Sequence, residues 1–206
     1  MLLGNGDGTF QAAINTPIPS TPSGLVVADL NQDGNLDIAT STNGNLTLLL
    51  GNGNGTFQVQ QPLSLTAVPL AAGDLNGDGK PDLVAAKFAF GTPIETLLNN
   101  GDGTFTIVQS LFVVGSGGGS VALSDLNGDQ KLDLVMAQSG EIEVPSTVSV
   151  LHGNGDGSFA NFPSYGTAPG SIAAADFNGD GKIDLGLGVR TLTKTGNGFF
   201  LWTPRQ

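Results

Sequence analysis

The sequence Asp74-Leu75-Asn76-Gly77-Asp78-Gly79-Lys80-Pro81-Asp82 decides how the rest of the chain is interpreted. It carries oxygen-bearing side chains at positions 1, 3, 5 and 9 and leads directly into the apolar run Leu83-Val84-Ala85-Ala86. The chain holds four such units, called acidic loops 1 to 4 in chain order, at Asp29–Asp37, Asp74–Asp82, Asp125–Asp133 and Asp176–Asp184. Three carboxylates within nine residues repel one another unless a cation neutralises them. The sequence therefore predicts cation binding.

A second motif, rich in glycine, alternates with the acidic loops. It reads Gly-Asn-Gly-Asp-Gly-Thr-Phe at residues 4–10 and recurs with small changes at 51–57, 99–105 and 153–159. Asn-Gly and Asp-Gly tolerate the positive φ angles of tight hairpin turns, and apolar runs flank each copy. A phosphate-cradling loop would need a Lys-Ser/Thr ending and a following helix, which the motif lacks. We therefore predict hairpin turns, called glycine turns below.

The repeat length predicts an all-β fold. Each repeat is close to fifty residues long and has four short apolar runs, which favours a β-propeller of four-stranded antiparallel blades over a helical solenoid with its period near 3.6. In the second repeat we expect strands at residues 69–73, 83–86, 95–98 and 104–109. The first strand of each repeat is rich in small residues, which suit the crowded innermost strand around a propeller axis.

Residues 1–206 are expected to form a single β-propeller region. The approximate repeats are residues 15–62, 63–110, 111–164 and 165–206. Residues 1–14 would be an outer strand pair of a preceding or closing blade, and Phe199–Trp202 the third strand of the last repeat. We expect the region to be part of a larger propeller. The alternative is a closed four-bladed ring.

Charge and composition exclude several classes of function. The formal net charge is −11 with only seven scattered Lys and Arg, so nucleic acid is not expected as a partner. The fifteen aspartates all lie in the two motifs, and one divalent cation per acidic loop would bring the charge to −3. There is no cysteine for a disulfide or thiolate metal site. No apolar run is long enough for a membrane span, and Met1–Gly4 does not begin a signal peptide.

The acidic loops offer the ligands of a hard cation. Ca²⁺ takes about six to eight oxygen ligands, and positions 1, 3, 5, 7 and 9 offer carboxylates, an amide oxygen and a backbone carbonyl around a glycine bend. The EF-hand loop begins similarly but needs Glu at position 12 and flanking helices. Position 12 here is Thr40, Ala85, Met136 and Leu187, followed by β-type runs, which excludes the EF-hand. The chain has no cysteine and one histidine, so it offers few of the sulfur and nitrogen ligands that softer metals prefer.

The acidic loop paired with the glycine turn resembles the FG-GAP/VCBS repeat, found in the N-terminal β-propeller of integrin α subunits and in many bacterial surface and secreted proteins. The resemblance spans nearly the whole chain. It implies up to four Ca²⁺ ions, one per repeat, each bound between the first two strands of a blade through positions 1, 3, 5, 7 and 9. These residues are Asp29, Asn31, Asp33, Asn35, Asp37; Asp74, Asn76, Asp78, Lys80, Asp82; Asp125, Asn127, Asp129, Lys131, Asp133; and Asp176, Asn178, Asp180, Lys182, Asp184.

Loop 3 departs from the pattern, because Gln130 replaces the glycine at position 6. If that position needs a positive φ, a side chain there costs about 1 kcal/mol. We therefore expect the third calcium site to be the weakest.

The lysines at position 7 of loops 2, 3 and 4 are expected to contribute only their carbonyls to the calcium sites.

The expected function is a binding or adhesion scaffold for a protein or glycan, extracellular or at the cell surface, in which Ca²⁺ is structural. No acid, base or nucleophile accompanies any loop, so we expect no catalytic residue and no enzyme activity. The alternative is the propeller portion of a secreted polysaccharide-acting enzyme or lectin.

Three side features each leave an alternative open. Glu141 and Glu143 could be a glycosidase pair, but two residues apart on a strand they point the same way and fit a solvated edge. Phe88 and Phe90 could contact a sugar, although packing between blades is the simpler interpretation. His152 could mark a pocket, but a lone histidine at a strand end needs no special role.

Overall fold

The computed structural model of the chain describes residues 1–66, 68–86, 94–111, 120–138, 147–160, 164–165, 172–187, 190–194 and 200–202. Within these ranges the structure is made of strands, turns and irregular segments, with no helix. The side features Phe88, Phe90, Glu141 and Glu143 lie outside the described residues.

Four antiparallel sheets follow one another along the chain. Sheet 1 contains β1 (Pro22–Ala28), β2 (Asp37–Thr42), β3 (Asn45–Gly51), β4 (Phe57–Val59) and β5 (Leu63–Thr66). Sheet 2 contains β6 (Val68–Gly73), β7 (Asp82–Ala86), β8 (Ile94–Asn99) and β9 (Phe105–Leu111). Sheet 3 contains β10 (Val121–Ser124), β11 (Asp133–Gln138), β12 (Thr147–Gly153), β13 (Phe159–Ala160) and β14 (Ser164–Tyr165). Sheet 4 contains β15 (Ile172–Ala175), β16 (Asp184–Leu187), β17 (Arg190–Lys194) and β18 (Phe200–Trp202).

The strands expected in the second repeat are confirmed within two residues by β6 to β9. The assignment of Phe199–Trp202 as a third strand is wrong, because β17 is the third strand and β18 pairs with it as the fourth. The sequence of β17, Arg-Thr-Leu-Thr-Lys, lacks the apolar run by which the other third strands are recognised. The sequence analysis therefore took the next apolar run for the third strand, although that run contains β18, the fourth strand of the sheet.

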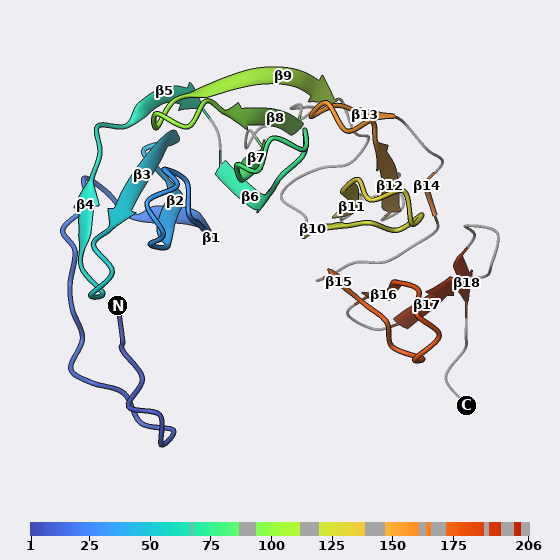
Figure 1. Cartoon of the computed structure of the whole chain (residues 1–206), viewed down its shortest axis with the longest axis horizontal. Coiled ribbons are helices and arrows are strands. Elements are labelled where there is room, and N and C mark those ends of the chain that lie inside the picture. Colours follow the sequence, from blue (N-terminus) through green and yellow to red (C-terminus); the bar gives the residue numbers. More distant parts are fainter. Residues whose placement is uncertain are drawn as a thin grey trace, which may run out of the picture.

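The four sheets are arranged as blades of a β-propeller (Figure 1). The first strands lie innermost, since β1 contacts β6, β6 contacts β10 and β10 contacts β15. The small residues of these strands permit that close approach. The sheets form an open arc and do not close into the four-bladed ring (Figure 1).

Residues 1–14 form a hairpin beside sheet 1, at the opposite end of the arc from sheet 4 (Figure 1). Gly4 pairs with Phe10, and the N–H of Gln11 donates to the carbonyl of Leu3 at 2.8 Å. The hairpin touches the next glycine turn, because a Cβ built on Gly55 would lie 2.9 Å from Leu3 Cδ2.

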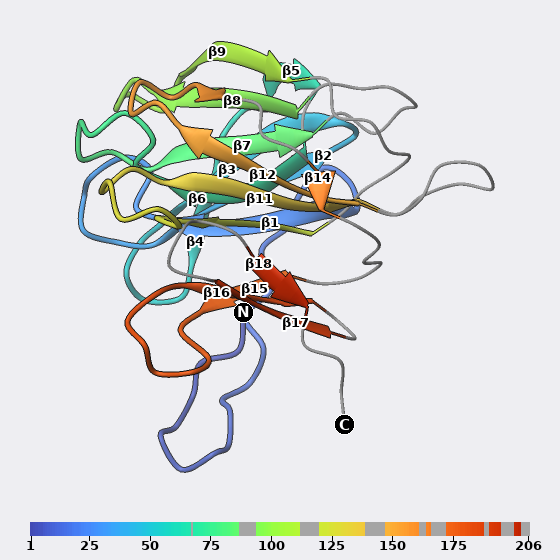
Figure 2. The same cartoon turned by 90° about the vertical axis from the view of Figure 1, so that its right-hand side faces the viewer.

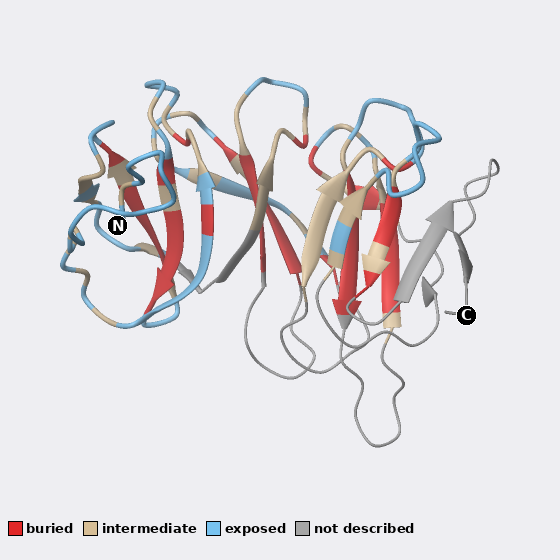
Figure 3. Cartoon of the chain, turned by 90° about the horizontal axis from the view of Figure 1, so that it is seen from below, coloured by how far each residue is buried: buried red, intermediate tan, exposed pale blue. Residues whose placement is uncertain are grey.

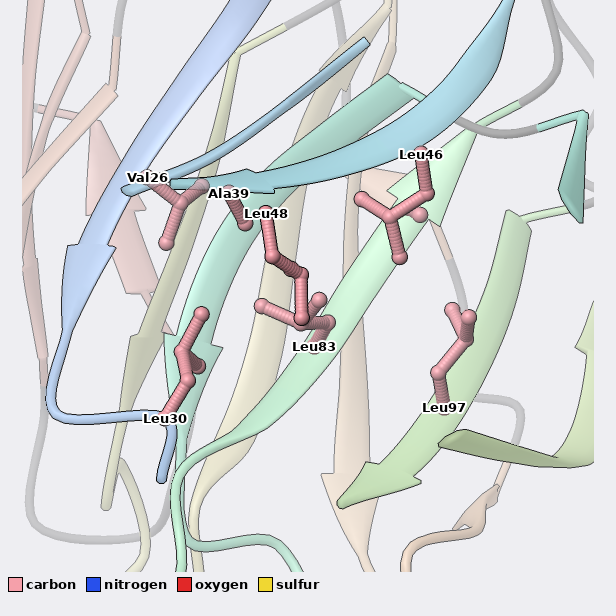
Figure 4. Close-up of a cluster of buried hydrophobic side chains, with 8 residues drawn as sticks. Val26, Leu30, Ala39, Leu46, Leu48, Leu83 and Leu97 are labelled. Atoms are coloured by element: carbon pink, nitrogen blue, oxygen red, sulfur yellow. The ribbon is translucent and has the colours of Figure 1, made fainter. Parts of the chain in front are cut away.

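The hydrophobic core lies between successive sheets rather than in one central cluster. Figure 4 shows the first interface, where Leu48 of sheet 1 lies against Leu83 of sheet 2. Position 2 of the acidic loop belongs to this core in the first three repeats, where Leu30, Leu75 and Leu126 are at most 4% exposed. Burying such a side chain contributes about 1.5–3 kcal/mol. Each interface therefore anchors one end of an acidic loop, while positions 4 to 6 of the loop are exposed (Figure 3).

Candidate cation-binding loops

The four acidic loops lie on one side of the molecule (Figure 2). Each joins the first strand of its sheet to the second, and each glycine turn at 51–57, 99–105 and 153–159 joins the third strand to the fourth. In an antiparallel meander these two connections emerge at the same end of the sheet. The two sequence motifs are therefore neighbours in space in every sheet where both are present.

The side chains at positions 1 and 3 turn toward the backbone of their own loop. In loop 2, Asp74 Oδ1 accepts the N–H of Gly77 at 2.7 Å, and Asp74 Oδ2 accepts the N–H of Gly79 at 2.9 Å. Asn76 Oδ1 accepts the N–H of Asp78 at 3.0 Å, and Asp78 Oδ1 in turn accepts the N–H of Lys80 at 2.9 Å. Loops 3 and 4 repeat the same bonds. The acidic loops therefore coil around their own N–H groups, which the side chains at positions 1, 3 and 5 accept.

Position 6 needs a positive φ in every loop. The φ angles are 86° at Gly34, 81° at Gly79, 66° at Gln130 and 80° at Gly181. Gln130 therefore adopts the left-handed backbone conformation, which is strained for a residue other than glycine.

Sequence reasoning missed that position 4 has a positive φ as well. Its values are 60° at Gln32, 77° at Gly77, 84° at Gly128 and 77° at Gly179. Loop 1 therefore carries the same kind of strain as loop 3, one bend earlier. The pattern Asn-Gly at positions 3 and 4 of the other three loops was the available signal.

The aspartate at position 9 clamps its loop to the sheet. It is 0% exposed in all four loops, at Asp37, Asp82, Asp133 and Asp184. Its Oδ2 accepts the N–H of position 2, for example Leu75 to Asp82 at 2.9 Å. In sheets 1 to 3 its Oδ1 accepts the N–H of the last residue of the third strand, at 2.8–2.9 Å, with donors Gly51, Asn99 and Gly153. Sequence spacing suggested only a metal ligand here, whereas both oxygens already bind backbone donors.

The carboxylates of loop 2 act on one another electrostatically. Burial raises the pKa of the Asp82 carboxyl, and the neighbouring Asp78 and Asp74 carboxylates raise it further, against the lowering by the N–H groups of Asn99 and Leu75. A positive charge between these groups would relieve that repulsion.

The side chain at position 7 reaches the carboxylate at position 5. Lys80 Nζ lies 2.8 Å from Asp78 Oδ2, and Lys182 Nζ lies 3.7 Å from Asp180 Oδ2. The hydrogen bond from the Lys80 side chain holds the pKa of the Asp78 carboxyl below its usual value. The ammonium groups thus interact with the loops, beyond the carbonyl contribution expected from the sequence.

His152 lies near the end of β12, as expected, and its side chain contacts loop 3. Its Nδ1 is 3.1 Å from Asp133 Oδ1 and 3.5 Å from the side-chain nitrogen of Asn127. The other repeats have Leu3, Leu50 and Leu98 at the equivalent position. Loop 3 therefore differs from the other repeats in having an imidazole, instead of a leucine, at this position.

The donor set fits a hard cation in its chemistry, although the carboxylates are not gathered tightly. Within the described residues, no three carboxylate or imidazole side chains come together as a ready metal cluster. The oxygens of positions 1 and 3 nevertheless converge on one N–H group, for example Asp29 Oδ1 and Asn31 Oδ1 at 3.1 and 3.0 Å from the nitrogen of Asp33. A carboxylate oxygen that accepts one N–H keeps a second lone pair for a ligand.

The model of the FG-GAP-like repeat matches residues 1–40, 29–85, 74–136 and 125–187. The chain belongs to the FG-GAP-like repeat family. Each FG-GAP-like match that starts at an acidic loop runs from that loop across the next one, so it includes the glycine turn between them. No curated protein matches the chain.

Two solved structures resemble this FG-GAP-like chain. One is a lectin from Agrocybe aegerita described as specifically recognising non-reducing terminal N-acetylglucosamine. It is 20% identical with a TM-score of 0.61, over 97% of this chain and 58% of the lectin. The other is the Photorhabdus luminescens Tc holotoxin pore, 23% identical with a TM-score of 0.45, over 91% of this chain and 9% of that chain. The first likeness supports the fold, and this chain spans about three-fifths of that lectin.

The part of the chain that the structure describes contains no helix long and apolar enough to cross a membrane.

Proposed function

We propose that this chain is a calcium-stabilised β-propeller module that serves as an extracellular binding or adhesion scaffold for a protein or glycan. The observation that carries the calcium role is the inward turn of positions 1, 3 and 5 in acidic loops that each hold three aspartates. Oxygen donors in this arrangement suit Ca²⁺ better than metals that prefer nitrogen or sulfur.

In each loop the side-chain oxygens of positions 1, 3 and 5 and the carbonyl of position 7 would hold the ion. The buried aspartate of position 9 would share its remaining lone pairs while keeping its two backbone bonds. A bound cation neutralises the loop and cross-links its residues, so its binding free energy adds to the stability of the fold. The proposed role of calcium is therefore structural.

The scaffold role is supported by the family and by the fold. FG-GAP-like repeats build the propeller, and the similarity to a lectin favours a glycan or protein as the ligand class. The alternative is that the chain forms the propeller portion of a secreted polysaccharide-acting enzyme or lectin. A polysaccharide-acting face would need clustered Arg, His, Tyr or Glu, and this chain has only one His, one Tyr, two Arg and three Glu, which favours binding without catalysis.

Thermal unfolding with and without calcium tests the structural role. At a calcium concentration about 100 times the Kd, one site adds about 2.7 kcal/mol, which raises the Tm of a chain of this size by about 5–10 °C. Excess EDTA should lower the Tm, CaCl₂ should restore it, and equimolar MgCl₂ should not. An identical melting curve in EDTA and in CaCl₂ would contradict the proposal.

Glycan and protein arrays probed with the calcium-loaded chain test the scaffold role. Binding that is lost in EDTA and regained with CaCl₂ is expected. Turnover of a bound polysaccharide, measured by release of reducing ends, would instead support the enzyme alternative.

A further inference from the structure

Position 7 is where the acidic loops differ in charge. Loop 1 has Asn35, whereas loops 2, 3 and 4 have Lys80, Lys131 and Lys182. Both residue types act on the carboxylate at position 5. Asn35 Nδ2 donates to Asp33 Oδ1 at 2.9 Å, and the Lys80 ammonium lies 2.8 Å from the corresponding carboxylate. A neutral donor in one loop is thus replaced by a positive charge in another.

The glycine turn of the same sheet holds the position-7 side chain in place. A Cβ built on Gly101 would lie 3.1 Å from Lys80 Cε, and a Cβ built on Gly155 would lie 3.0 Å from Lys131 Cε. In sheet 1, a Cβ on Gly53 would lie 2.5 Å from Asn35 Oδ1. The glycine therefore leaves room for the side chain to lie across the turn. This contact gives a physical reason for the pairing of the two motifs in sheets 1 to 3.

We propose that the residue at position 7 tunes the calcium affinity of its acidic loop, with Lys80 and Lys182 acting as tethered counter-ions, so that loop 1, which lacks this charge, binds calcium more tightly than loop 2. This inference rests on the calcium function proposed above. The three aspartates of loop 1 face no ammonium from position 7, whereas those of loops 2 and 4 are partly neutralised. A divalent ion in loop 2 or 4 must share the position-5 carboxylate with an ammonium group, or displace it.

The size of the effect follows from Coulomb's law. A single positive charge about 5 Å from a divalent ion, in water-like dielectric and physiological salt, weakens binding by about fivefold to tenfold. The same charge stabilises the loop when no metal is present, because it offsets the mutual repulsion of the aspartates. Loops 2 and 4 should therefore hold their shape in a chelator better than loop 1.

The experiment uses the full chain and a CaCl₂ titration followed by amide resonances. The N–H groups of Gly34 and Gly79 are reporters for loops 1 and 2, since each donates to the position-1 carboxylate of its loop. The variants are Lys80→Met, which keeps the stem lying across Gly101 but removes the charge, and Asn35→Lys, which adds the charge to loop 1. Each variant has the untouched loop in the same molecule as its internal control.

In the wild-type chain, the Gly34 resonance is expected to saturate at a lower calcium concentration than the Gly79 resonance. Lys80→Met should tighten loop 2 by about fivefold to tenfold without changing loop 1, and Asn35→Lys should weaken loop 1 by a similar factor. In EDTA, Lys80→Met should lower the Tm by about 1–2 °C, because an exposed ion pair is lost.

Loops that bind calcium but keep the same affinities in both variants would overturn this inference and leave the calcium function intact. Wild-type resonances that do not respond to calcium in any loop would overturn both, and the wild-type titration alone identifies that failure. An unchanged or higher Tm of Lys80→Met in EDTA would overturn the counter-ion role without reference to calcium.

Discussion

Replacing Gln130 by glycine should stabilise the protein. Gln130 occupies position 6 of loop 3 with a φ of 66°, where the other three loops have glycine. A non-glycine residue in this left-handed region costs about 1–2 kcal/mol. The N–H of Gln130 donates to Asp125 Oδ2 at 2.8 Å, and glycine would keep this bond. The substitution therefore removes backbone strain without removing that hydrogen bond.

The stability gained by Gln130→Gly is partly offset by the higher conformational entropy of the unfolded chain. Glycine gives the unfolded chain more conformational freedom, which costs about 0.4–1 kcal/mol on folding. Subtracting this from the strain leaves a net stabilisation of about 0–1.6 kcal/mol, with a central value of about 0.8 kcal/mol. For a chain of this size, the central value corresponds to a rise in Tm of about 2–3 °C.

Differential scanning calorimetry in EDTA measures this gain without a contribution from calcium. Gly181→Gln in loop 4 is the matched reverse substitution, because a Cβ at Gly181 meets nothing within 4 Å and its φ is 80°. It should lower the Tm by a similar amount. If Gln130→Gly does not raise the Tm and Gly181→Gln is neutral, positive φ at position 6 is not costly. The reason for expecting a weak third calcium site would then be lost.

Three other substitutions or conditions test the fold and its loops. In EDTA, Asp82→Asn should destabilise the chain by about 1–3 kcal/mol in urea unfolding, because a buried N–H loses its acceptor; a loss seen only with calcium present would mean that position 9 acts purely as a metal ligand. Gln109→Ala should cost about 1–3 kcal/mol, since the Gln109 side chain accepts from the N–H of Phe159 and donates to its carbonyl across sheets 2 and 3; an unchanged urea midpoint would refute this. Acid should destabilise the glycine turns as the pH falls below about 4. Side-chain hydroxyls and N–H groups lower the pKa of the aspartates in these turns. Their ionised forms therefore stabilise the native state, and protonation removes that stability. The carboxyls concerned are Asp7, Asp102 and Asp156. The raised pKa of Asp82 acts in the opposite direction and should offset part of this loss; a Tm that rises steadily from pH 7 to pH 3 would contradict the expected sign.

The strands and the coiled loops were predictable because their signals are local. The four strands of sheet 2 coincide with apolar runs bounded by turn residues. Misassignment occurred at β17, where the strand is held by pairing with its neighbours rather than by an apolar run. The positive φ of Gln32 was missed because glutamine carries no signal for a left-handed conformation.

The sequence by itself determined the repeat and the sheet class, and it favours the local hydrogen bonds that coil each acidic loop. The hydrogen bonds that define this coil join residues two to five positions apart, so spacing alone specifies them. Only the tertiary structure decided how the position-9 aspartates are used, because their second donors come from strands 14 to 20 residues away. It also decided that Lys80 lies across Gly101 and that Gln109 binds Phe159 in the next sheet. These contacts depend on how the strands pair and how one sheet packs on the next, which no short stretch of sequence encodes.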